Sequence, residues 1–210
     1  MGYDADIDRR RFMAKKTGTV KKTETFTTRM EPREKYLLEL LARASGKSIA
    51  KTLESAVQEA AKQASMNIRG RPEIKVADLI GVLWCPQEWK RIVWLAGLAP
   101  HLLSYDESCK LELLLQSSAI CIGVSRDNAG TVTQISLIPR AAEIGWPLIV
   151  ERSELMAEGL PAPAPTLQEI EKLYGGHIEE VGPDFGVTFD FSRFQRRALG
   201  QGEDEPLSLN

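Results

Sequence analysis

The stretch TETFTTRM, residues 23–30, alternates between two kinds of side chain and stands directly before a long helical pattern. Alternation at a period of two predicts a β-strand with two different faces. One face carries the two large apolar groups, Phe26 and Met30, and we expect it to point toward a core. The outward face is polar and consists of Thr23, Thr25, Thr27 and Arg29.

Two amphipathic helices are predicted after this strand. Residues 31–46 begin with Pro32, which suits the first helical position, and end at Gly46. Residues 47–64 begin with Ser48, a preferred N-cap residue. The apolar side chains of the two helices recur every three or four residues, as one buried face requires. They are Leu38, Leu41, Ala42, Ile49, Leu53, Val57 and Ala60.

A strand that lacks a partner in its own chain predicts a dimer. No segment near residues 23–30 resembles a second strand, and a lone strand leaves its N–H and C=O groups unpaired. The nearest partner is the same strand of a second subunit, with four helices beneath the pair. The shared core would contain Phe26, Met30, Leu38, Leu41, Ile49, Leu53 and Val57. A unit this small buries too little surface alone, so we expect the dimer to be obligate.

Residues 25–61 resemble the ribbon-helix-helix superfamily of Arc, MetJ and CopG-type repressors in the order strand, Pro32, helix, Gly46-Lys47-Ser48, helix. The resemblance implies an N-terminal β-α-α fold, built as an intertwined dimer, whose paired strands enter the major groove of DNA. It also implies base contacts and a phosphate contact at the start of the second helix. The implied base contacts are Thr25, Thr27 and Arg29. The implied phosphate contacts are Lys47, Ser48 and Ile49.

The chemistry of these residues suits DNA independently of the resemblance. Arg29 can donate two hydrogen bonds to guanine, and Thr25 and Thr27 can bond a base edge or touch a thymine methyl. Free N–H groups at a helix N-terminus, as after Ser48, favour an anion. The simpler alternatives are an ordinary exposed strand face and an N-cap without a ligand.

Charge is divided unevenly along the chain, whose net charge is −2. Residues 1–72 hold 16 Lys and Arg against 9 Asp and Glu, which gives +7, and residues 73–210 hold 11 against 20, which gives −9. Residues 1–22 read as a flexible basic arm that ends in Lys22, a further candidate phosphate contact. A solvated tail without a ligand is the equal alternative for this arm.

The rest of the chain predicts a second domain of different composition. After the ribbon-helix-helix unit, 23–66, we expect a linker at 67–75, an α+β domain of unassigned fold at 76–197, and a disordered acidic tail at 198–210.

Within the second domain, residues 76–118 are mostly helical in pattern, with breaks near Pro86 and Pro100. Residues 119–138 predict two strands joined by a turn, and 147–151 a third. Thr166 and Glu169 form a capping box for a helix that ends near Tyr174, and 185–191 predicts a last strand.

Several motifs are weighed and set aside. Gly46-Lys47-Ser48 is not a nucleotide-binding loop, because the first Gly of that motif would fall at Leu41. His101 and His177 lie far apart without ligands nearby, so we predict no metal and no cofactor. The cysteines fit reduced thiols rather than a disulfide framework; they are Cys85, Cys109 and Cys121. Three tryptophans five residues apart fit core packing, with a ligand pocket or subunit contact as alternatives; they are Trp84, Trp89 and Trp94.

The sequence therefore predicts a homodimeric, sequence-specific DNA-binding protein that represses transcription, and not an enzyme. Tetramer formation on DNA, and a protein partner or small ligand of residues 76–197, stay open. One alternative is an accessory factor of plasmid transfer or partition that recruits a partner through the second domain. Another is the antitoxin of a toxin–antitoxin pair. With no long apolar run and no secretory signal in this sequence, we expect a cytoplasmic location and no membrane contact.

Overall fold

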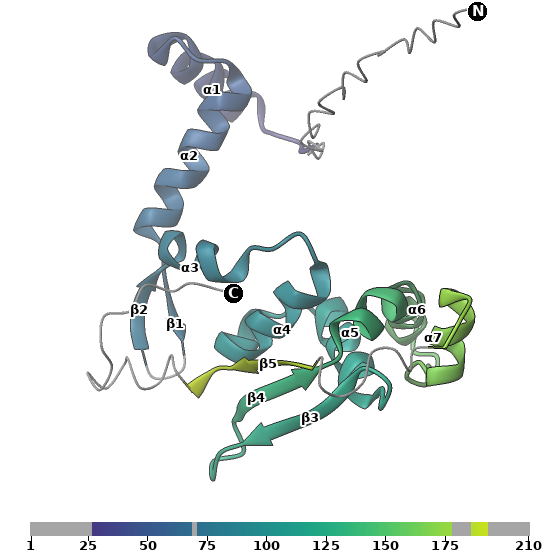
Figure 1. The fold of residues 1–210 in the computed structure, drawn as a ribbon. Coiled ribbons are helices and arrows are strands. Elements are labelled where there is room, and N and C mark those ends of the chain that lie inside the picture. Colours follow the sequence, from purple (N-terminus) through teal and green to yellow (C-terminus); the bar gives the residue numbers. More distant parts are fainter. Residues whose placement is uncertain (1–26, 69–70, 178–185, 193–210) are drawn as a thin grey trace, which may run out of the picture. The chain divides into compact units, whose positions relative to one another are not determined.

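The computed structural model describes residues 27–68, 71–177 and 186–192 of the chain (Figure 1). This described part is helix-rich, with two small antiparallel sheets. It divides into two compact units, Met1–Thr52 and Leu53–Asn210, which are described separately. The division falls inside the second helix.

Helix α1 spans Pro32–Ser45 and helix α2 spans Ile49–Gln63. Pro32 occupies the start of α1, and Gly46 ends it in the left-handed conformation, with φ of 64°. The Lys47 N–H donates to the Ala42 carbonyl at 3.0 Å, which closes the end of α1. The Ser48 hydroxyl accepts from the Lys51 N–H at 3.2 Å, so the predicted N-cap of α2 is confirmed.

The predicted N-terminal β-α-α fold is wrong. Residues 27–31, directly before α1, form no strand, and among the described residues the first strand begins at Ser65. Residues 23–26, the first half of the predicted strand, lie outside the described residues. The physical reason is that alternation of side chains is necessary for a strand but not sufficient, because a strand exists only through hydrogen bonds to a neighbouring strand.

The described residues of the predicted linker, 67–68 and 71–75, form strands instead. Strand β1, Ser65–Ile68, pairs antiparallel with strand β2, Arg71–Lys75, and helix α3, Val76–Leu83, follows at once. The Lys75 ammonium donates to the Ser65 hydroxyl at 2.9 Å across the pair. Residues 67–68 and 71–75 therefore belong to two paired antiparallel strands.

The helical breaks predicted near Pro86 and Pro100 are confirmed. Helix α4 spans Glu88–Leu98, the 3₁₀ turn η1 spans Pro100–Leu102, and helix α5 spans Tyr105–Gln116. Ser104 and Glu107 close the start of α5 with a reciprocal capping box.

A three-stranded antiparallel sheet in the order β3-β4-β5 forms the base of the second unit (Figure 1). Its strands are β3, Cys121–Arg126, β4, Val132–Leu137, and β5, Val187–Asp190. β3 and β4 confirm the two predicted strands and their turn, and β5 lies within the predicted last strand. Helices α6, Pro139–Ala157, and α7, Leu167–Tyr174, complete the unit.

The predicted strand at 147–151 is wrong, because these residues lie inside α6. Their short apolar run fits a buried strand or a buried helix equally well. The buried residues of α6 recur at helical spacing; they are Ala141, Ala142, Gly145, Ile149 and Ser153.

Aromatic rings from the helices and the last strand meet in the core of the second unit. The Trp94 ring lies edge-on to Phe189 at 5.4 Å and to Phe191 at 5.6 Å between centroids, and Trp89 lies edge-on to Phe189 at 6.1 Å. Phe191 is fully buried. Edge-on aromatic contacts add specificity to the burial of apolar area, so these rings pack β5 and the residue after it against α4.

The predicted capping box at α7 is confirmed and gives a testable pH dependence. The Arg152 guanidinium donates to the Glu169 carboxylate, which also accepts from the Thr166 N–H at 2.9 Å. These donors lower the pKa of Glu169 from 4.5 to about 2. A lowered pKa stabilises the fold above the unfolded pKa, and this contribution is lost as the pH falls from 4.5 toward 2.

Glu169→Gln is therefore expected to reduce the free energy of unfolding by about 1 kcal/mol at pH 7, a value reduced for solvent screening. The screening matters because the Glu169 side chain is 41% exposed. The deficit relative to the wild type should shrink as the pH falls below 4.5. Denaturant titrations at several pH values measure this, with Glu154→Gln, an exposed site on α6, as control. A deficit that stays constant down to pH 2 would contradict it.

Candidate nucleic-acid interface

The predicted base-contacting residues that the structure describes lie immediately before α1. Thr27 and Arg29 are both exposed there. Three further predicted site residues, Lys22, Thr25 and Phe26, lie outside the described residues. Thr27 and Arg29 are thus accessible to a large ligand, and their role in base contacts stays a prediction.

The turn between α1 and α2 brings the predicted phosphate-contacting residues together. Lys47, Ser48 and Ile49 are consecutive and exposed, and the Ser48 side chain caps α2. The amides of Ile49 and Ala50 belong to the first helical turn, whose N–H groups have no acceptor within the helix. Such a turn is suited to an oxyanion, although an N-cap serves the helix equally well without one.

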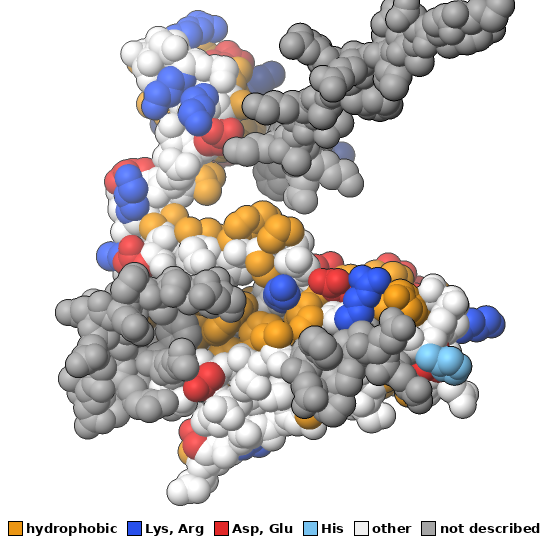
Figure 2. Space-filling model, in the orientation of Figure 1, with side chains coloured by type: hydrophobic (Ala, Val, Ile, Leu, Met, Phe, Trp, Pro, Cys, Tyr) orange, Lys and Arg blue, Asp and Glu red, His pale blue; other side chains and the backbone are white. Residues whose placement is uncertain are grey.

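Exposed cations lie along α1 and on both sides of this turn. Lys and Arg side chains stand out over α1 and the start of α2 in the space-filling view (Figure 2). Those of the first unit that follow the predicted strand are exposed; they are Arg33, Lys35, Arg43, Lys47 and Lys51. Arg43 lies 3.7 Å from Glu39 in an exposed pair, which costs little to rearrange. The surface near the α2 N-terminus therefore combines positive charge with helix N–H groups.

The apolar residues predicted to form a dimer core are largely exposed in the single chain. Met30 is 41%, Leu41 50%, Ile49 50% and Val57 61% exposed. Leu38 and Leu53 are half-buried. Further apolar side chains of α1 are exposed beside them; they are Tyr36, Leu37 and Leu40. These side chains form an exposed apolar stripe on α1 and the start of α2.

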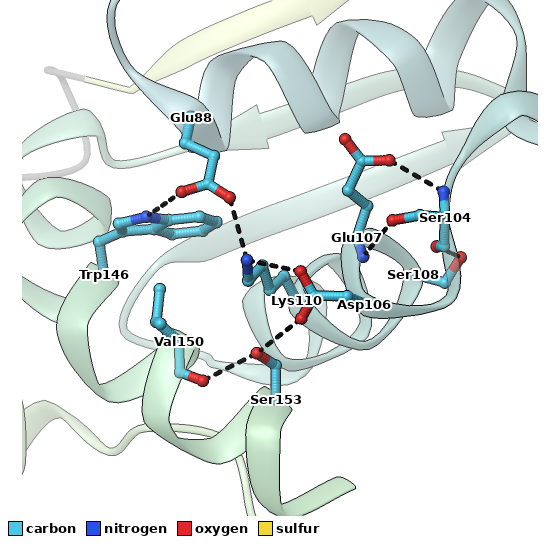
Figure 3. Close-up of polar contacts among 9 residues, drawn as sticks. All are labelled: Glu88, Ser104, Asp106, Glu107, Ser108, Lys110, Trp146, Val150 and Ser153. Atoms are coloured by element: carbon cyan, nitrogen blue, oxygen red, sulfur yellow. Dashed lines mark hydrogen bonds and ion pairs between the residues drawn. The ribbon is translucent and has the colours of Figure 1, made fainter. Parts of the chain in front are cut away.

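A cluster of polar groups around the buried Lys110 joins α4, α5 and α6 in the second unit (Figure 3). The Lys110 ammonium contacts the Asp106 carboxylate at 2.7 Å and the Glu88 carboxylate at 3.0 Å. The Trp146 indole donates to the other Glu88 oxygen at 3.3 Å, and Ser153 donates to Asp106 at 3.3 Å. Each of the five side chains Glu88, Asp106, Lys110, Trp146 and Ser153 has a polar partner within the cluster.

The electrostatics of this cluster are those of a structural ion pair. Burial by itself would lower the pKa of Lys110, but the hydrogen bonds to Asp106 and Glu88 outweigh it, so the pKa lies above its ordinary value. The ammonium is thus held charged, and a charged lysine is neither a base nor a nucleophile. We infer that the cluster has a structural role, which is to join α4, α5 and α6.

Sequence reasoning missed this cluster. The only signal was Lys110 at a position of α5 whose neighbours Cys109, Leu113 and Leu114 are buried. A lysine on the apolar face of a helix needs a partner. Glu88 lies 22 residues away along the chain, so no local pattern identifies it as that partner.

The structure also bears on metals and on membranes. Among the described ranges, no group of three or more His, Cys, Asp or Glu side chains is placed to hold a metal ion. His177 instead lies 3.3 Å from Glu171. Within the same ranges, no helix has both the length and the apolar character needed to cross a bilayer.

Comparison of the chain with protein-family models, with curated proteins and with solved structures finds no match.

Proposed function

We propose that the chain is a double-stranded DNA-binding protein that acts as a homodimer in the cytoplasm and represses transcription by occupying its site. The observation that carries the proposal is the division of charge, +7 over residues 1–72 against −9 over residues 73–210. Phosphate contacts supply most of the affinity of DNA-binding proteins, and a positive segment beside a negative one directs those contacts to one end of the chain.

The α1–α2 turn supports contact of DNA with the basic end of the chain. The exposed cations Lys47 and Lys51 lie next to the N-terminus of α2, the positive end of the helix dipole. Arg29 lies a few residues before α1 and is exposed. In the proposal, Lys47 and Ser48 bind phosphate while Arg29, with Thr25 and Thr27, reads bases. The proposal does not depend on pairing of strands.

The exposed apolar stripe supports the homodimer. An amphipathic helix gains its stability by burying its apolar face, and α1 leaves Leu37, Leu40 and Leu41 between 41% and 57% exposed. A contiguous patch of this kind marks a protein contact. Two copies of a DNA-binding chain also recognise two half-sites, which doubles the number of phosphate contacts.

The two alternatives share the DNA contact and differ in purpose. A DNA-binding accessory factor of plasmid transfer or partition would use the second unit to recruit its partner, and the folded core of that unit suits such a role. An antitoxin would use the same region to neutralise a toxin.

The test of the proposal is selection from a randomised pool of DNA duplexes with the purified full chain, followed by titration of the selected duplex and of a mixed-sequence duplex. Arg29→Ala should weaken binding to the selected duplex about 5- to 150-fold, the equivalent of about 1–3 kcal/mol, and change mixed-sequence binding little. Lys47→Ala should weaken both equally. Lys172→Ala, an exposed lysine of α7, is the control. No enrichment, with no binding of either duplex at low salt, would refute the proposal.

A further inference from the structure

We draw no further inference here: the strongest candidate, the exposed apolar side of helix α3 around Ile80 with Trp84 directly after the helix, carries no proposal, because nothing in the structure shows what covers it.

Discussion

Binding of duplex DNA by the full chain is expected to weaken by about 10³- to 10⁵-fold between about 50 and 200 mM salt, if the dimer makes about six to ten phosphate contacts. Each neutralised phosphate releases condensed counterions, so the affinity depends on salt as a power law. The basic residues of the first unit that the structure describes near α2 include Lys47 and Lys51, and residues 9–22 add seven more Lys and Arg.

Fluorescence anisotropy of a labelled mixed-sequence duplex over a salt series measures this dependence. The slope of log affinity against log salt gives the number of phosphate contacts. Lys47→Ala should reduce that slope by about 1 per chain, whereas Lys172→Ala should leave it unchanged. The chain could still bind DNA while the slope corresponds to fewer than two phosphate contacts. That result would show that phosphate neutralisation by the first unit is not the source of affinity.

Gly97→Ala is expected to destabilise the second unit by about 3 kcal/mol or more, at the upper end of the cost of overpacking a core. Gly97 lies in α4, and a Cβ at this position would stand 2.1 Å from the Phe191 ring. Phe191 is fully buried and packs edge-on against Trp94, so the ring cannot move away without disturbing its neighbours. Relief would require β5 to separate from α4.

Chemical denaturation of the two proteins at low micromolar concentration measures the loss, and Gly81→Ala is the matched control. Gly81 lies inside α3 in open space, so there the added methyl should stabilise the helix by up to about 1 kcal/mol. We therefore expect Gly97→Ala to lower the free energy of unfolding and Gly81→Ala to raise it. Equal small effects at both positions would mean that Phe191 does not occupy the place that the structure assigns to it.

Local chemistry accounts for the parts of the fold that the sequence predicted. Pro32, Gly46 and Ser48 define the ends of α1 and α2 because each acts on the backbone within a few residues. Thr166 and Glu169 close the start of α7 in the same way. The apolar residues of α1 and α2 could be assigned to one stripe, but not to a partner, because periodicity states which face is apolar and not what covers it.

By itself the sequence determined the ends of α1, the starts of α2 and α7, the turn between β3 and β4 and the division of charge, because these depend on neighbouring residues or on composition. Only the tertiary structure decided the absence of a strand at 27–31, the placement of 147–151 inside α6, and the pairing of Lys110 with Glu88. It alone also left Trp84 outside the core while burying Trp89. Each of these depends on contacts between segments distant in the chain, and such contacts leave no pattern among adjacent residues.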